Sequence, residues 1–502
     1  MGIVIRQSIK GTFVTYIGSC VGILVSLIIL PRYLGDELIG LTRVLFEASA
    51  VFAIFFQLGA SSSAMRFFPY FKSEDKKNNG FFFYLISLVT IGFILFIPLF
   101  FLLKDSIIHF FSDGSPLFIQ YLYWLIPLTF FLIYWTTFEL YSNILMRIAV
   151  PKFIREVGVK VLLILVYVSY GLGYLNLDGL IAAFVGIYGI PMLISFFYVS
   201  RIGSISLKHD SSFVSPALKK KILSYSSIIL IGSLGATLGG KIEIFMISAE
   251  MSLASVGIYS IASFMSNVIE IPSRSISVIS APIAADALKR NDIETVRNLY
   301  KKVSLHQLLI GSSLFVLIWI NIDSIYSIIE LISGKDNFRA GKWVVFYLGL
   351  AKIIEITIGF GGTLISFSKH YKWNLFFTFF VTGVTIFLNW LLIPKLGISG
   401  SAIATLLTYI VVYGGLQLIL VLVKVKVNPF SIGTIKILGV ISLAFILNFL
   451  LPDLANTWIN SIYKTLIISS ISGFLIYFLN ISEETNRIIN SLFEKLKLYI
   501  KK

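Results

Sequence analysis

The sequence has one cysteine and four histidines. Cys20 stands alone in an apolar run, so neither a disulfide framework nor a zinc site built from thiols can form. The histidines are spread over the whole chain, without the close spacing of a metal cluster (His109, His209, His306, His370). We therefore expect no metal site, no cofactor and no catalytic residue among these groups.

Charge is also scarce. Only 13% of the residues are charged and 57% are hydrophobic, whereas a soluble domain carries about 25% charged residues. The mean hydropathy is +0.90. Apolar runs of about 20 residues recur along the chain, each long enough to cross ~30 Å of hydrocarbon as a helix. This excludes an ordinary soluble protein and predicts an all-α, polytopic membrane protein.

We predict about fourteen transmembrane helices. The first six lie near 12–31, 40–62, 82–103, 118–140, 155–175 and 179–200. The next six lie near 223–247, 255–279, 303–321, 343–366, 374–393 and 399–423. A last pair lies near 433–451 and 461–480. The connections are short, so we expect no soluble catalytic domain.

The basic residues are distributed unevenly among these connections. Of the 41 Lys and Arg residues, 30 fall at the termini and in the even-numbered connections, and only seven in the odd-numbered ones. Positive charge favours the cytoplasmic side, so we expect both termini in the cytoplasm. The net charge of +16 then reflects topology. It gives no basic patch on a folded module, so we expect no nucleic-acid partner.

Glycine patterns suggest an internal repeat. The pair Gly18 and Gly22 recurs at an offset of 217 residues as Gly235 and Gly239. Gly40 matches Gly257 at the same offset, and the stretch around Gly179 matches that around Gly400 at an offset of 221. The similar offsets predict two parallel halves of six helices each. The predicted domains are 1–215, 216–425 and 426–502, the last holding helices 13 and 14 and an amphipathic tail at 488–500.

Eight of the charged residues inside the predicted spans are candidates for a substrate site. Each such charge costs roughly 2.5–3.5 kcal/mol on insertion and usually faces a bundle interior or an aqueous cavity. Spacings of three or four residues allow pairing on one helix face, whereas Lys241 and Glu243 are two apart and point away from each other. We predict that the eight line a cavity that binds substrate, the alternative being pairs that only staple helices together. They are Arg43, Glu47, Lys241, Glu243, Glu270, Arg274, Lys352 and Glu355.

Two long stretches resemble a known family. LPRYLGDELIGLTRVLFEASAVFAIFFQLGASSSAMRFFP (30–69) is similar to its first loop and second helix, and APIAADALKRNDIETVRNLYKKV (281–303) to its cytoplasmic link after span 8. The paired stretches GLIAAF and GSAIAT also fit. The family is that of Wzx-type flippases of lipid-linked polysaccharide repeat units, within the multidrug/oligosaccharidyl-lipid/polysaccharide superfamily.

The resemblance implies two six-helix lobes in a V shape that work by alternating access in the bacterial cytoplasmic (inner) membrane. The implied cargo is an undecaprenyl-diphosphate-linked oligosaccharide for lipopolysaccharide O-antigen, capsule or exopolysaccharide. Arg43 is the residue best carried over, as a cation for the diphosphate. Membrane lipids and the polysaccharide polymerase machinery are the expected partners, with the protein itself a monomer.

Three alternatives remain. A drug exporter of the MATE type usually has twelve spans and an acidic cavity, and a lipid II flippase differs little from a repeat-unit flippase in sequence. A membrane polymerase or ligase would need a large outward loop, and the longest here is about 321–342. Transport is driven either by the membrane potential or by a proton or sodium gradient through an in-span glutamate.

Overall fold

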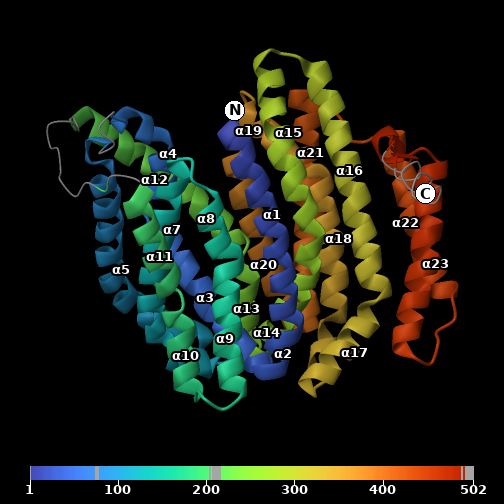
Figure 1. Cartoon of the computed structure of the whole chain (residues 1–502), viewed down its shortest axis with the longest axis horizontal. Coiled ribbons are helices and arrows are strands. Elements are labelled where there is room, and N and C mark those ends of the chain that lie inside the picture. The colour runs from blue at the N-terminus through green and yellow to red at the C-terminus, as the bar shows by residue number, and fades with distance from the viewer. Residues whose placement is uncertain (1, 74–77, 203–204, 206–215, 488–489, 492–502) are drawn as a thin grey trace, which may run out of the picture. The chain divides into compact units, whose positions relative to one another are not determined.

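The computed structural model describes residues 2–73, 78–202, 205, 216–487 and 490–491. Every regular element in this part of the chain is helical, which confirms the all-α prediction (Figure 1). Contacts divide the chain into two compact units. The first comprises Met1–Ile261, Ile332–Gly334 and Thr382–Ile398, and the second Ala262–Leu331, Lys335–Val381 and Ser399–Lys502.

Eleven helical segments among the described residues are long and apolar enough to cross a membrane. They are Phe13–Tyr33, Asp36–Phe71, Asn78–Phe111, Leu177–Ile202, Lys220–Gly239, Leu253–Lys289, Ile293–Ile320, Asn337–Phe367, Lys372–Val425, Ile432–Leu450 and Thr457–Phe478. The chain is therefore a polytopic membrane protein. The difference from the predicted fourteen comes from three places.

Predicted spans 11 and 12 are joined in Lys372–Val425. Its 54 residues would extend ~80 Å as one helix, far more than one crossing needs. The segment is therefore long enough for two crossings. Gly397, with a φ of 58°, breaks the helix within it. Predicted spans 4 and 5 are also helical, but they are not among the eleven segments. They are α7 (Leu125–Ile144) and the run formed by α8 (Ala149–Phe153), the π-helix η4 (Ile154–Gly158) and α9 (Val159–Gly171).

In the first unit, α3 packs against α5, α7 and α12, and α7 also packs against α11. The central helix α3 is thus enclosed on several sides, which explains how it can carry charged side chains. The unit's helices are α1 (Gly2–Leu24), α2 (Leu30–Tyr33), α3 (Asp36–Phe56), α4 (Ala60–Phe71), α5 (Phe81–Phe111), α6 (Pro116–Gln120), α7, α8, α9, α10 (Leu177–Gly186), α11 (Gly189–Ile202), α12 (Pro216–Gly239), α13 (Ile242–Glu250) and the start of α14 (Leu253–Asn267).

In the second unit, α16 packs against α15, α18, α22 and α23. Phe315 on α16 is fully buried, against Phe346 and Phe445. The unit's helices are the end of α14, α15 (Ile271–Lys289), α16 (Ile293–Ile320), α17 (Ile322–Ser333), α18 (Lys342–Ile358), α19 (Phe360–Phe367), the ends of α20 (Lys372–Tyr409), α21 (Leu418–Leu420), α22 (Ile432–Leu450) and α23 (Thr457–Phe478).

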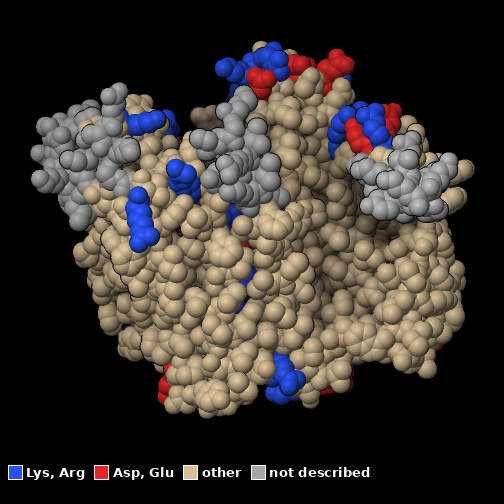
Figure 2. Space-filling model, in the orientation of Figure 1, with Lys and Arg blue, Asp and Glu red and all other residues tan. Residues whose placement is uncertain are grey.

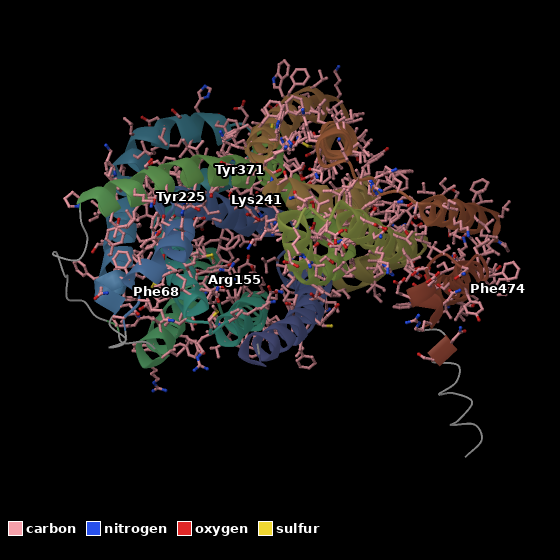
Figure 3. The ribbon with its side chains drawn as sticks, turned by 90° about the horizontal axis from the view of Figure 1, so that it is seen from above. Phe68, Arg155, Tyr225, Lys241, Tyr371 and Phe474 are labelled. Carbon is pink, nitrogen blue, oxygen red and sulfur yellow. The ribbon has the colours of Figure 1, made fainter. Side chains whose placement is uncertain are left out.

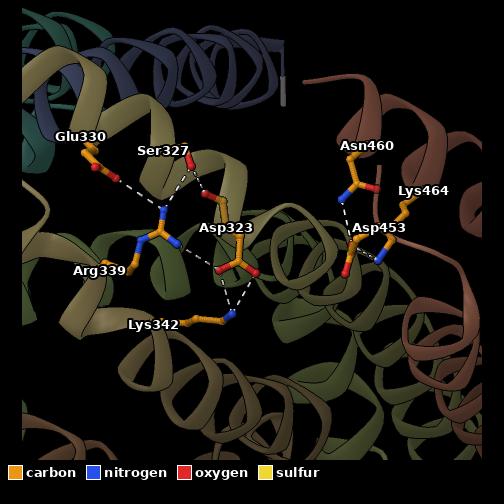
Figure 4. Close-up of polar contacts among 8 residues, drawn as sticks. All are labelled: Asp323, Ser327, Glu330, Arg339, Lys342, Asp453, Asn460 and Lys464. Atoms are coloured by element: carbon orange, nitrogen blue, oxygen red, sulfur yellow. Dashed lines mark hydrogen bonds and ion pairs between the residues drawn. The ribbon is translucent and has the colours of Figure 1, made fainter. Parts of the chain in front are cut away.

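Charged side chains of the second unit gather at its two ends. At the turn between α15 and α16, Asp286, Lys289 and Arg290 are exposed, and the space-filling view shows this charged tip above an almost uncharged band (Figure 2). At the other end, Lys342 lies 2.8 Å from Asp323, and Lys464 lies 2.7 Å from Asp453 (Figure 4). The hydrogen bond from Lys464 lowers the pKa of Asp453. A band with few charged side chains on its surface between two charged ends is typical of a membrane protein.

Gly40 and Gly257, matched in the sequence repeat, lie at one close crossing of α3 and α14. A Cβ atom on Gly40 would lie 1.8 Å from the carbonyl oxygen of Leu253, and one on Gly257 would lie 2.0 Å from that of Asp36. The two backbones therefore touch without an intervening side chain, as small residues permit between membrane helices.

The predicted domain boundaries and the V-shaped arrangement stay predictions. The predicted amphipathic tail at 488–500 lies outside the described residues, apart from 490–491.

We expect Gly40→Ala to destabilise the protein by about 1–3 kcal/mol, because the added methyl group forces two backbones apart. The measurement is the thermal unfolding midpoint of the purified protein in detergent. Gly186→Ala is the control, since a Cβ there meets nothing within 4 Å. Equal midpoints for the two variants would contradict the close crossing.

Candidate functional site

The helix α3 brings the first predicted pair together. It starts after Gly35, whose φ of 77° suits glycine, and Asp36 and Glu37 occupy its first turn, where acidic residues favour helix formation. Four residues separate Arg43 from Glu47, so both side chains lie on one face. The ion pair forms, with 2.7 Å between Arg43 Nη2 and Glu47 Oε1.

Glu47 has a second cation from another helix. Lys241, immediately before α13, places Nζ 3.0 Å from Oε1 and 2.9 Å from Oε2 of Glu47. Figure 3 shows Lys241 among the helices of the first unit. One buried carboxylate thus holds two cations that are 198 residues apart in the chain.

The two cations are much more accessible than the acid between them. The exposed fraction is 1% for the Glu47 side chain, 40% for Arg43 and 34% for Lys241. In addition, Arg43 Nε is buried and makes no hydrogen bond to any described residue. The cluster of Arg43, Glu47 and Lys241, which we call the basic cluster, carries one excess positive charge. Its exposed side is therefore cationic and suits an anion.

Glu243 points elsewhere, as its two-residue spacing from Lys241 predicts. It accepts a hydrogen bond from the hydroxyl of Tyr259 on α14. Lys241 and Glu243 therefore bind partners on different helices.

The second unit contains the other four predicted residues. Lys352 on α18 lies 2.8 Å from Glu355 and 3.0 Å from Glu270, and Arg274 on α15 lies 3.3 Å from Glu270. The two pairs expected from spacing both form, and Lys352 joins them into one network. With two cations and two carboxylates, this network is formally neutral.

Each unit thus gathers its own predicted residues. That they line a cavity and bind substrate stays a prediction. No group of three or more His, Cys, Asp or Glu side chains within the described ranges is placed to hold a metal ion.

Sequence reasoning missed an ion pair inside the first unit. Arg155, in the π-helix η4, donates from Nε to Glu139 Oε2 at 2.8 Å and lies over the Trp135 ring at 5.2 Å from its centroid. Figure 3 shows Arg155 among the helices of this unit. Glu139 lies at the end of the predicted span 118–140, and Arg155 at the start of the predicted span 155–175. No local signal links them, because 16 residues separate them and they lie on two different helical elements, α7 and η4.

A comparison with known families now identifies the chain. Residues 8–285, more than half of the sequence, match the family described as "Polysaccharide biosynthesis protein". The chain belongs to this family. A search of the curated proteins found no match.

Solved structures show the same fold. The lipid II flippase MurJ, in an inward closed conformation, aligns over 94% of this chain and 99% of its own, with a TM-score of 0.70 and 16% identity. An inward-facing multidrug resistance MATE transporter of the MOP superfamily aligns over 79% and 92%, with a TM-score of 0.59 and 16% identity. The Vibrio cholerae MATE transporter VcmN, in its bent form, aligns over 82% and 96%, with a TM-score of 0.52 and 12% identity.

This family member should depend on Glu47 for stability. We expect Glu47→Gln to cost about 3–5 kcal/mol, because it leaves two neighbouring cations without their carboxylate. Adding Lys241→Met should restore part of that loss. Thermal unfolding of the purified single and double variants measures both effects.

Glu355→Gln is the matched control. Its side chain is 27% exposed, and Lys352 keeps Glu270 as a partner, so its loss should be smaller. Strictly additive effects of Glu47→Gln and Lys241→Met would show that the two residues do not interact.

Proposed function

We propose that this protein is a flippase for undecaprenyl-diphosphate-linked oligosaccharide repeat units. It moves them from the inner to the outer leaflet of the bacterial cytoplasmic membrane by alternating access, for a surface polysaccharide such as O-antigen, capsule or exopolysaccharide. The observation that carries the proposal is the basic cluster, an excess of positive charge inside a membrane-spanning unit. The family supports the polysaccharide pathway, and the fold supports transport.

The chemistry of the basic cluster fits a diphosphate. Arginine binds phosphate oxygens through its planar fork, and lysine acts as a point charge. Glu47 is buried behind them, where it reduces the repulsion between the cations and fixes their positions. The anion replaces water at Arg43 and Lys241 without needing either cation to become uncharged.

Two alternatives share this fold. A cationic drug would meet the exposed Arg43 and Lys241 rather than a free carboxylate, so the charge of the basic cluster disfavours a MATE-like exporter. A lipid II flippase is favoured by the alignment with MurJ over 94% of the chain, and its cargo is also an anionic glycolipid. The sugar attached to the lipid separates these two functions.

In this proposal both termini lie in the cytoplasm, the protein works as a monomer, and polymerase machinery receives its product.

The membrane potential can drive the transport. About two negative charges moving outward across 100 mV gain roughly 4–5 kcal/mol. The membrane potential then favours outward movement of the cargo without a coupling ion.

We expect Arg43→Ala to abolish surface polysaccharide while leaving the protein in the membrane, because the diphosphate loses its arginine. The measurement is surface glycan and membrane-inserted protein in a deletion strain that carries the variant. Arg274→Ala, in the neutral network of the second unit, is the matched control and should have a weaker effect. Normal surface glycan with Arg43→Ala would overturn the role of Arg43.

We expect transport to continue when the proton gradient is collapsed at constant membrane potential. The measurement is flipping of the lipid-linked oligosaccharide in proteoliposomes with a potassium diffusion potential. A halt under these conditions would instead indicate proton coupling, for which Glu47, Glu243, Glu270 and Glu355 are the candidate carriers.

A further inference from the structure

A polar pocket lies beside α12 in the first unit, at the turn between α3 and α4. Its volume is about 340 Å³, which falls within the range of small-molecule sites. The polar residues that line it are Gln57, Ser61, Ser62, Ser233 and Thr237, and the rest of its lining is glycine, alanine or aliphatic. No charged side chain is among these lining residues, so the pocket suits an uncharged ligand.

Several of its polar groups are available for a ligand. The hydroxyls of Ser62, Ser233 and Thr237 make no hydrogen bond to another described residue, although serine and threonine in apolar helices commonly bond to the preceding turn. Gln57 is fixed, because its amide nitrogen donates to the hydroxyl of Thr136 and to Ile133 O at 3.3 Å. The pocket therefore combines a rigid amide with three unpartnered hydroxyls.

The pocket lies on the side of α12 opposite an exposed apolar residue. Ile231, which is 54% exposed, lies on the opposite side of α12 from Ser233, two residues away. An apolar exposed face on one side and hydroxyls on the other indicate that the pocket side of α12 faces water or cargo.

The same helices connect the pocket to the basic cluster. Thr237 and Ser233 precede Lys241 by four and eight residues, and α12 ends at Gly239, two residues before Lys241. Gln57 follows Glu47 by ten residues, about 15 Å along α3. Tyr225 and Lys241, both labelled in Figure 3, bracket the part of α12 that lines the pocket. Thr237, Ser233 and Gln57 thus lie within ten residues of the basic cluster along the chain.

We propose that this pocket binds an uncharged sugar ring of the lipid-linked cargo while the basic cluster holds its diphosphate. Sugar hydroxyls both donate and accept hydrogen bonds, as do the hydroxyls of Ser62, Ser233 and Thr237. Gln57 Oε1 already accepts from Ser61 and has room to accept one more hydrogen bond. Ile54, Ile229 and Leu230 supply an apolar surface for the C–H face of the ring. This proposal rests on the proposed function and adds the place at which the protein recognises the glycan.

Other ligands fit the pocket less well. A phosphate would need a cation and a metal ion would need carboxylates, and the lining supplies neither. An isoprenoid chain would bury the hydroxyls without partners, at a cost of about 1–3 kcal/mol each.

The test compares two ligands on the full-length protein in nanodiscs. One is undecaprenyl diphosphate, and the other is the undecaprenyl-diphosphate-linked oligosaccharide extracted from cells that lack this gene. The variant is the triple substitution Ser62→Ala, Ser233→Ala and Thr237→Val, which removes three hydroxyls with little change in volume. Ser227→Ala, on α12 outside the pocket lining, is the matched control.

We expect the triple variant to lose about tenfold in affinity for the glycolipid and none for undecaprenyl diphosphate, because only the glycan loses hydrogen bonds. Arg43→Ala should weaken binding of both ligands. A wild-type protein that binds both ligands equally, or a triple variant that weakens both, would overturn the sugar site and leave the proposed function standing. Failure of the wild-type protein to bind either ligand would overturn the proposed function itself.

Discussion

The carboxylate of Glu47 controls the arrangement of charge in the first unit. It is 1% exposed, and Arg43 and Lys241 each place a nitrogen within 3 Å of its oxygens. Two cations this close repel each other strongly when no acid lies between them. This interaction also joins α3 to the segment before α13, and so it determines where the excess positive charge is exposed.

The two units compensate the charged side chains inside their membrane spans in different ways. In the second unit, Glu270, Lys352, Glu355 and Arg274 neutralise one another within a single network. In the first unit, Glu243 turns to a tyrosine hydroxyl, and two cations share one acid. Ion pairs that hold helices together account for a neutral network. They do not account for an exposed excess of positive charge. This difference is why the proposed diphosphate site lies in the first unit.

Much of this could be predicted from residue type and spacing. Apolar runs predicted an all-α membrane protein, and the intervals of three or four residues predicted the Arg43–Glu47, Glu270–Arg274 and Lys352–Glu355 pairs. Sequence could not choose partners across helices. The pairs Lys241–Glu47, Tyr259–Glu243 and Arg155–Glu139 depend on packing between segments 16 to 194 residues apart. The helix count differed because predicted spans 11 and 12 form one continuous helical segment that is interrupted at Gly397, and because predicted spans 4 and 5 are not among the eleven segments.

The crossing at Gly40 and Gly257 also sets the register of the charged residues. Gly40 lies three residues before Arg43, and α14 follows α13, which begins directly after Lys241. Because backbone touches backbone there, α3 and the α13–α14 segment cannot slide past each other by even a fraction of a turn without a clash. The distance between Glu47 and Lys241 thus depends on a crossing at which two backbones touch without side chains between them. The contact between these two glycine-containing backbones therefore helps to fix the relative position of the residues in the basic cluster.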